Sequence, residues 1–237
     1  MLNFFRPKEH KPYISAVILC AGNSSRMGDG INKQLVIIND MPVIMHSIMA
    51  FENCVDIDEI VLVCKEDMIP DLNAMVKEYG CGKVTTIVQG GDVRTRSSKI
   101  GVESTSEKSQ YVLIHDGARP LVTRELISLV VQAAVEYGAA APSTSIFETV
   151  KHVDSDGFVT ETLNRQNLRT IQTPQGFSKN VYLSAFLRGS DDVDLFDDCQ
   201  LIELYGGKVK LVDGSRDNIK ITTLEDINTV RNILENI

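Results

Sequence analysis

The chain has 237 residues, of which 43% are apolar and 24% are charged, so it can bury a core without the help of disulfides or a structural metal. Its net charge of −8 argues against nucleic acid or an anionic membrane as a general partner, so an anionic ligand must meet a local cluster of basic residues. The five cysteines lack metal-ligand or redox spacing and are typical of reduced thiols packed as small hydrophobic residues.

Residues 1–13 do not have the layout of a signal peptide, and the apolar run that follows is too short to cross a membrane, so we expect a cytoplasmic protein. Five β-branched, apolar segments then predict buried strands: Ala16–Cys20, Glu59–Cys64, Lys83–Val88, Tyr111–His115 and Ala139–Ile146. Segments with helical spacing of apolar residues lie between them: Pro42–Phe51, Ile69–Tyr79, Thr95–Ser104 and Arg124–Tyr137. This alternation predicts an α/β, Rossmann-like fold, with a mostly parallel twisted sheet and helices on both faces.

The pattern changes after Ile146. Residues Phe147–Leu163 alternate between apolar and polar around an Asp-Ser-Asp-Gly sequence that ends at Gly157, which predicts a β-hairpin. Its length and polarity indicate a projecting arm, at about residues 147–172, that contacts a second subunit. Farther along, Lys179–Arg188, Asp194–Tyr205 and Leu224–Ile237 are predicted helices, and Lys208–Val212 and Ile219–Thr222 are predicted strands. We expect residues 1–237 to form a single domain with this arm.

The first predicted strand ends in a loop, Cys20–Lys33, that is rich in small and polar residues. The loop contains neither a G-x-G-x-x-G fingerprint nor a Walker A sequence. Small residues nevertheless let backbone N–H groups approach an anion closely, and Arg26 and Lys33 add positive charge. The loop therefore predicts an irregular phosphate-binding site, with a turn whose basic residues are merely solvated as the alternative.

Four further polar segments follow the predicted strands and the arm: Gly90–Ser98, His115–Pro120, Leu163–Phe177 and Asp217–Thr223. Each has an ordinary explanation by itself, such as a helix cap or a surface ion pair. Ligands of open α/β sheets collect at the carboxyl ends of the strands, so we expect these segments to lie near the first loop. We expect Lys220, in the last segment, to lie inside a short strand.

Three features that resemble catalytic or metal-binding groups have simpler interpretations. We expect His115 to support the end of its strand by hydrogen bonding, and His46 to pack among the apolar residues of its helix. The acidic run Asp191–Asp198 is interpreted as a solvated loop and a helix N-terminus, because carboxylates are favoured at that end of the helix dipole.

The motifs LCAGNSSRMG with Lys33-Gln34, GGDVRTRS, HDGARP, NRQNLRTIQTPQ and DNIKIT resemble those of the 2-C-methyl-D-erythritol 4-phosphate cytidylyltransferases of isoprenoid biosynthesis, in order and in spacing. The resemblance extends from Ser15 to the final helix. It implies transfer of CMP from CTP to the phosphate of methylerythritol 4-phosphate, with release of pyrophosphate and formation of the diphosphocytidyl product. HDGARP and TPQ are also shared with polyol-phosphate cytidylyltransferases, so an enzyme that acts on ribitol 5-phosphate is the alternative.

The same resemblance implies roles for individual residues. The catalytic residues would be Arg26, Lys33, Arg165 and Lys220. The nucleotide would be bound by Cys20, Ala21, Gly22, Gly91, Asp92, Ser97 and Asp116. The sugar-alcohol phosphate would be bound by Asp116, Arg119, Thr149, Arg165 and Thr173. Of these, Thr149, Arg165 and Thr173 would come from the arm of a second subunit, which implies a homodimer with shared active sites. The implied cofactor is Mg²⁺ bound with CTP, and Asp116 is its best protein ligand.

The residue types suit this chemistry. Nucleotidyl transfer depends on positioning and charge neutralisation, and the attacking phosphate oxygen is already ionised at neutral pH, so no general base is required. Two functions of other classes compete. A NAD-dependent oxidoreductase would need the glycine fingerprint that is missing here, and a non-catalytic nucleotide sensor would be expected to lack the basic residues Arg26, Lys33 and Lys220, which are present.

Overall fold

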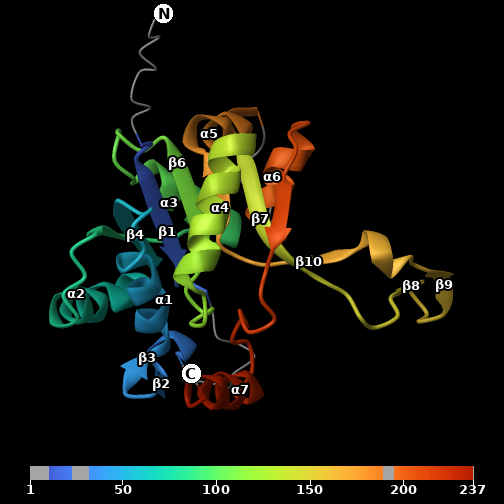
Figure 1. The fold of residues 1–237 in the computed structure, drawn as a ribbon, viewed down its shortest axis with the longest axis horizontal. Coiled ribbons are helices and arrows are strands. Elements are labelled where there is room, and N and C mark those ends of the chain that lie inside the picture. Colours follow the sequence, from blue (N-terminus) through green and yellow to red (C-terminus); the bar gives the residue numbers. More distant parts are fainter. Residues whose placement is uncertain (1–10, 23–31, 189–194, 237) are drawn as a thin grey trace, which may run out of the picture.

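The computed structural model describes residues 11–22, 32–188 and 195–236. Its centre is an eight-stranded sheet with the order β10-β7-β11-β6-β1-β4-β5, and β12 pairs with β7 (Figure 1). The bounds of these strands are β1 Ile14–Leu19, β4 Glu59–Cys64, β5 Val84–Gln89, β6 Tyr111–Asp116, β7 Ala139–Ser145, β10 Arg169–Ile171, β11 Gln175–Ser178 and β12 Lys210–Asp213. β1, β4, β5 and β6 pair in parallel, whereas β11 and β10 pair antiparallel with their neighbours. The predicted mostly parallel sheet is therefore confirmed.

Seven helices accompany the sheet in the described part of the chain: α1 Val43–Glu52, α2 Ile69–Glu78, α3 Arg94–Glu103, α4 Arg124–Tyr137, α5 Lys179–Arg188, α6 Asp198–Leu204 and α7 Leu224–Leu234. Short 3-10 turns lie at η2 (Lys33–Leu35), η3 (Glu66–Met68) and η4 (Arg165–Asn167). None of the described helices is long and apolar enough to cross a membrane.

The buried strand β1 shows how helices cover both faces of the sheet. Ala16 and Ile18 belong to a core cluster with residues of α1, α2 and α4, whereas Val17 and Leu19 belong to a cluster with residues of α3, α5 and α6. Successive side chains of a strand point to opposite faces. One group of helices therefore packs on each face, and α7 packs separately, against Ile38 of a small hairpin formed by β2 (Ile37–Ile38) and β3 (Met41–Pro42).

Helix α4 illustrates why the longer helices were predictable. The side-chain oxygen of Thr123 accepts a hydrogen bond from the backbone N–H of Leu126 at the first turn. At the other end Gly138 has a φ of +86°, a left-handed conformation that ends the helix and that glycine adopts without steric cost. The helix accordingly has the predicted bounds.

Two parts of the chain differ from the sequence-based expectation. The strands β10 and β11 were not predicted. Conversely, the predicted strand at Ile219–Thr222 is wrong, because this segment has no regular structure. The backbone N–H of Ile221 donates to the carbonyl of Ala118 at 2.8 Å, but no ladder of such bonds forms along the segment.

The predicted hairpin corresponds to β8 (Lys151–Val153) and β9 (Val159–Thr162), which form a two-stranded antiparallel sheet of their own. Gly157 in the connecting turn has a φ of +84°, a conformation that L side chains rarely adopt. Every residue of both strands is exposed, and in Figure 1 the hairpin extends away from the body on a stalk formed by the segments beside it. We refer to residues 147–172 as the arm.

Candidate active site

A cavity of about 200 Å³ opens where β1 and β6 end. Its wall includes many of the residues predicted to bind the nucleotide or to act in catalysis: Ala21, Gly22, Lys33, Gly91, Asp92, Ser97, Asp116 and Lys220. These residues come from the loop after β1 and the start of η2, from the loop after β5 and the start of α3, from the end of β6, and from the segment before α7. The carboxyl edge of the sheet therefore collects them, as expected for an open α/β fold.

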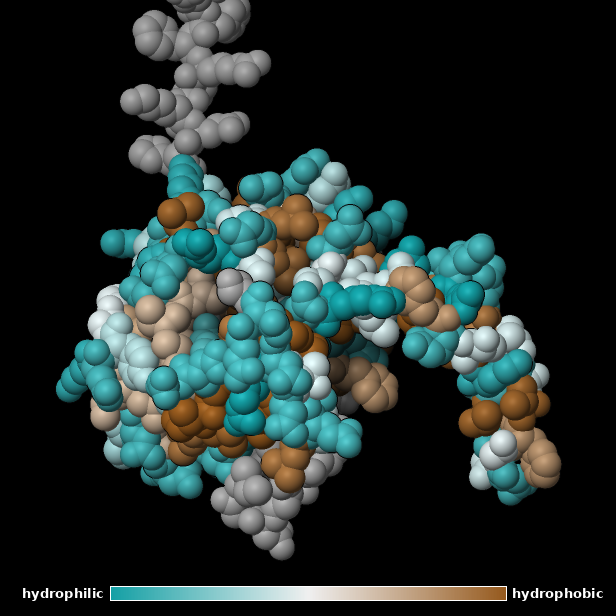
Figure 2. Space-filling model, turned by 60° about the horizontal axis from the view of Figure 1, so that its bottom comes forward, coloured by the Kyte–Doolittle hydropathy of each residue, from teal (hydrophilic) through white to brown (hydrophobic). Residues whose placement is uncertain are grey.

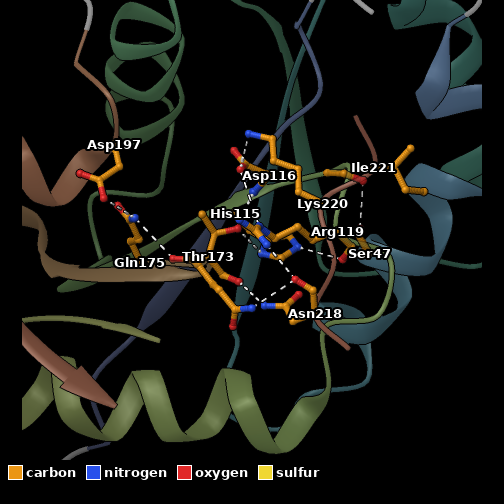
Figure 3. Close-up of polar contacts among 12 residues, drawn as sticks. Ser47, His115, Asp116, Arg119, Thr173, Gln175, Asp197, Asn218, Lys220 and Ile221 are labelled. Carbon is orange, nitrogen blue, oxygen red and sulfur yellow. Dashed lines mark hydrogen bonds and ion pairs between the residues drawn. The ribbon is translucent and has the colours of Figure 1, made fainter. Parts of the chain in front are cut away.

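Asp116 is the electrostatic centre of this cavity. Its carboxylate lies 2.8 Å from Nζ of Lys220 and 3.8 Å from Nε of Arg119 (Figure 3). The same carboxylate lies 3.4 Å from Nη2 of Arg94. Burial by itself would raise the pKa of Asp116, but the positive charges of Arg94, Lys220 and Arg119 outweigh it and hold the pKa well below its ordinary value. One carboxylate thus faces three cations, so the group as a whole keeps a positive charge.

Arg94 is a functional residue that the sequence-based assignment missed. Its Nη1 lies 2.7 Å from Oδ2 of Asp198, while its other nitrogens face Asp116. Asp198 is buried and also accepts a hydrogen bond of 2.7 Å from the hydroxyl of Tyr182. Burial would lower the pKa of Arg94, but the carboxylates of Asp198 and Asp116 reverse this and raise it. The guanidinium is therefore a fixed positive charge on the cavity wall.

The burial of Asp198 also corrects the interpretation of the acidic run as solvated. This carboxylate forms a buried ion pair with Arg94, which the solvated interpretation did not foresee. Asp197 beside it fulfils the expectation of a helix N-terminus, because its side chain accepts a hydrogen bond from the backbone N–H of Gln200 at the start of α6. Asp191, Asp192 and Asp194 lie outside the described residues.

Beneath Asp116, a layer of buried hydrogen bonds fixes the end of β6. The hydroxyl of Thr173 accepts from the backbone N–H of Asp116 at 3.0 Å and lies 3.0 Å from Nδ1 of His115. The second ring nitrogen of His115 lies 3.3 Å from the carbonyl oxygen of Arg119. Burial lowers the pKa of His115 to about 3, so the ring is neutral at physiological pH. The predicted supporting role of His115 is confirmed.

This arrangement corrects the placement of Thr173. The residue was expected on the arm, reaching the substrate of a second subunit, but it lies after β10 in the body and is 3% exposed. Its hydroxyl is engaged by Asp116 and His115, and its carbonyl oxygen accepts from Nδ2 of Asn218 at 2.9 Å. Thr173 therefore supports the site from within its own chain.

The segment that carries Lys220 is held by contacts from several elements. Nη1 of Arg119 donates to the carbonyl oxygen of Asn218 at 2.7 Å, and Nε2 of Gln172 donates to that of Ser215 at 2.7 Å. Nζ of Lys33 donates to the carbonyl oxygen of Ile221 at 3.1 Å. These bonds replace the missing strand and bring the two lysines to the same cavity.

The other predicted residues lie elsewhere. Cys20 is buried beside the cavity wall, and both its backbone N–H and its thiol donate to the carbonyl oxygen of Val63, so that N–H is already in use. Arg119 lies behind Asp116 and does not line the cavity. Thr149 and Arg165 are exposed on the arm and do not line it either; there Nη1 of Arg165 donates to the carbonyl oxygen of Phe147. Arg26 lies outside the described residues.

Asp116 does not fit the predicted role of a direct Mg²⁺ ligand. Both of its oxygens already contact cationic nitrogens, and a divalent cation placed on them would face three positive charges. Among the residues that the structure describes, no group of three or more His, Cys, Asp or Glu side chains is arranged to hold a metal.

The structure also confirms the expectations for His46 and for the cysteines. His46 packs in α1 with Nε2 lying 2.9 Å from the carbonyl oxygen of Ile38, as expected of a core histidine. All five cysteines are free and buried, in agreement with their interpretation as packed thiols.

Comparison with known proteins places this chain in a family. A model of the family "2-C-methyl-D-erythritol 4-phosphate cytidylyltransferase" matches residues 14–236. A curated protein of that name from Clostridium novyi is 38% identical over 224 residues, which are 94% of this chain and 96% of the relative. A second from Bacillus cereus is 39% identical over 212 residues, 89% of this chain and 93% of the relative. The crystal structure of 4-diphosphocytidyl-2C-methyl-D-erythritol synthase from Anaerococcus prevotii has 31% sequence identity and a TM-score of 0.84, over 95% of this chain and 97% of that one.

Proposed function

The chain belongs to the 2-C-methyl-D-erythritol 4-phosphate cytidylyltransferase family, and we propose that its reaction takes place in the cavity at the ends of β1 and β6. Members of this family are CTP-dependent enzymes of isoprenoid biosynthesis, so the chain transfers CMP from CTP to this sugar-alcohol phosphate. The observation that carries this placement is the cationic group around Asp116. In a chain with a net charge of −8, Lys33, Arg94 and Lys220 meet at one cavity wall. Such a concentration of positive charge suits a triphosphate.

In the reaction, an oxygen of the acceptor phosphate attacks the α-phosphorus of CTP. A new P–O bond forms there, the bond between the α-phosphorus and its bridging oxygen breaks, and pyrophosphate leaves with the electron pair. The nucleophile needs no general base, since it is already ionised. The residues of the cavity therefore serve to bring two anions together and to stabilise the charge that develops on the transferring group.

We assign Lys33 and Lys220 the task of stabilising the negative charge that develops on the transferring phosphoryl group. The segment 218–221 fixes both, because Lys33 donates to its backbone and Lys220 belongs to it. Asp116 holds Lys220 at 2.8 Å, so the ammonium group is positioned before the substrate arrives. Preorganised charges of this kind stabilise a transition state without reorganising during the reaction. Arg26 is assigned the same task from the sequence resemblance.

The nucleoside is assigned to the wall formed by Ala21, Gly22, Gly91, Asp92 and Ser97. Close approach of backbone is a structural requirement here. A Cβ atom at Gly90 would lie 2.8 Å from Cβ of Ala21 and 2.8 Å from Oγ of Ser97, and the same hydroxyl accepts from the backbone N–H of Gly91 at 3.1 Å. Glycine at position 90 thus lets the loop after β5 pack closely against the loop after β1.

Mg²⁺ is proposed to accompany CTP, since nucleotidyltransferases of this family generally use a divalent cation. When bound, the ion would lower the repulsion between the triphosphate and the second phosphate. We do not assign Asp116 as its ligand, because its oxygens are occupied by cations.

The arm is proposed to complete the active site of a second subunit in a homodimer. Thr149 and Arg165 are exposed on the arm and do not line the cavity of their own chain, so they reach a substrate only from another copy. Figure 2 shows hydrophobic side chains along the projecting arm, and Val153, Phe158 and Val159 are 51%, 72% and 59% exposed. Burying them against a partner would be favourable. We further propose a cytoplasmic location, which suits five free thiols.

Replacing one lysine tests the placement of the reaction. Lys220→Met keeps the length of the side chain but removes its charge, whereas Lys208→Met makes the same change at an exposed lysine before β12. Pyrophosphate release from CTP and methylerythritol 4-phosphate is expected to fall by about a hundredfold or more in kcat for the first variant. The second is expected to match the wild type. Equal turnover of both variants would remove the reaction from this cavity.

A further inference from the structure

Gln34 has a polar group for which the proposed roles give no use. The side chain is 3% exposed and lines the cavity next to Lys33. Its carbonyl oxygen, Oε1, is buried and has no hydrogen-bond partner in the described part of the chain. Buried polar atoms in native proteins are nearly always paired, because an unpaired one loses its hydration without compensation. An unpaired acceptor on the wall of a binding cavity is therefore a position for a donor from a ligand.

Local structure keeps this side chain in place. Gln34 lies in the 3-10 turn η2, where its backbone N–H donates to the side-chain oxygen of Asn32 at 3.1 Å. On the other side it approaches the loop after β6, since a Cβ atom added to Gly117 would lie 3.4 Å from Oε1. The same Cβ atom would lie 2.5 Å from Cδ1 of Ile44, so glycine at position 117 lets the backbone after β6 approach the side chains of Ile44 and Gln34 closely. The amide is thus wedged between η2 and the residue that follows Asp116.

The charges around the cavity indicate which donor fits. Lys33, Arg94 and Lys220 are donors and suit phosphate oxygens. Asp116 is an acceptor, but three cations occupy its oxygens. Both substrates carry hydroxyl groups, on the ribose of CTP and on the sugar alcohol, and these need acceptors when they leave water. The carbonyl oxygen of Gln34 is an uncharged acceptor that the protein itself leaves unused.

We propose that Gln34 is a substrate-binding residue whose Oε1 accepts a hydrogen bond from a substrate hydroxyl group, and that this bond helps to select hydroxylated substrates. The inference rests on the proposed placement of the reaction in this cavity. The hydroxyl belongs to the ribose of CTP or to the sugar alcohol, and the kinetic experiment separates these two sources.

Gln34→Met tests the proposal, because methionine has a similar volume and lacks the carbonyl oxygen. In the wild type the unpaired acceptor is relieved only by substrate, so the variant is expected to have a higher Tm without ligand and a weaker affinity for one substrate. The KM for that substrate is expected to rise about tenfold, the value of one uncharged hydrogen bond. Gln132→Met, at an exposed glutamine of α4, is the matched control and is expected to change neither KM nor Tm.

The two sources of the hydroxyl give different results. If it belongs to ribose, the KM for CTP rises in Gln34→Met. With the wild type, the KM for 2′-deoxy-CTP or 3′-deoxy-CTP then exceeds that for CTP by the same factor, whereas with the variant the deoxynucleotide and CTP have equal KM values. If it belongs to the sugar alcohol, the KM for methylerythritol 4-phosphate rises instead. The KM values for the deoxynucleotides are then the same for the wild type and the variant.

An active Gln34→Met enzyme with both KM values unchanged would overturn the proposal, as would a lowered Tm with unchanged kinetics, which is the mark of a purely structural glutamine. Gln34→Leu removes the same oxygen with a different shape and replaces the methionine variant if that one does not fold. Failure of the proposed function itself has a different signature. In that case Lys220→Met turns over as fast as Lys208→Met, which places the reaction outside this cavity whatever Gln34→Met does.

Discussion

The ion pair between Arg94 and Asp198 joins two largely buried charges, so breaking it is expected to lower the stability of the protein. In Arg94→Met, the carboxylate of Asp198 stays buried, with a side chain 2% exposed, and keeps the hydroxyl of Tyr182 but loses its cation. A buried charge that loses its partner destabilises a protein strongly. We therefore expect the variant to fold less stably as well as to lose activity.

The geometry gives the size of the effect. At the 2.7 Å between Nη1 and Oδ2, the direct attraction is roughly 6 kcal/mol for an effective dielectric constant of about 20. Because burial of the two charges opposes this attraction, we expect a net loss of about 3–5 kcal/mol in the free energy of unfolding. In a chain of 237 residues, each kcal/mol corresponds to roughly 2–4 °C, so the Tm is expected to fall by roughly 6–20 °C.

A double-mutant cycle measured by urea and thermal unfolding checks this reasoning. Asp198→Asn keeps an oxygen for Tyr182, and the double variant Arg94→Met with Asp198→Asn removes both charges. The double variant is expected to regain at least about 2 kcal/mol over the sum of the single losses, because no charge is left unpaired. Its pyrophosphate release is expected to stay low, since the cavity still lacks the guanidinium. Single losses that add without coupling would refute the account of this pair.

Three further expectations concern single residues. Lys33→Ala is expected to lower kcat for pyrophosphate release by about 10²–10³ with little change in Tm, and near-normal turnover would remove it from the catalytic group. Arg165→Ala is expected to raise the KM for the sugar-alcohol phosphate; a higher KM for CTP instead would reverse the assignment of the two substrates. His115 has a pKa of about 3 in the folded protein, against 6.5 for the free side chain, so only the unfolded chain takes up its proton as the pH falls. The free energy of unfolding therefore decreases below about pH 6.5, by at most about 1.4 kcal/mol per pH unit from this residue. In urea titrations between about pH 6.5 and 4.5, the free energy of unfolding of His115→Gln is expected to fall less steeply with pH than that of the wild type. Equal slopes would contradict the neutral, buried ring.

The sequence predicted those parts of the fold whose signal is local. β4 and α4 have the predicted bounds, because a continuous apolar run and a capped amphipathic segment carry their own signals. β10 and β11 have three and four residues, which is too short for a clear period. At Ile219–Thr222 the alternation of apolar and polar residues was misleading. There the pattern reflects Ile221 in the core and Lys220 facing Asp116, not a strand.

In the candidate site, too, some residues could be predicted from local sequence signals and others could not. Lys33, the glycines and Asp116 were predictable, since they lie at or after the ends of strands that meet at one edge of the sheet. Lys220 was selected by its motif, although the strand expected around it does not form. The pairing of Arg94 with Asp198 joins residues far apart in the sequence, and only the packing of α3 against the start of α6 brings them together. Arg94 did lie in a segment singled out by its position after a strand, which was the available signal. The internal role of Thr173 and the unpaired oxygen of Gln34 depend on tertiary contacts alone.

The most direct measurement is pyrophosphate release from CTP and Mg²⁺ with methylerythritol 4-phosphate, with ribitol 5-phosphate as a parallel acceptor. Release with methylerythritol 4-phosphate, and little or none with ribitol 5-phosphate, is the expected result. Release with ribitol 5-phosphate alone would keep the fold and the cationic cavity but contradict the acceptor. Release with neither would contradict the account of the cavity as a site of CMP transfer.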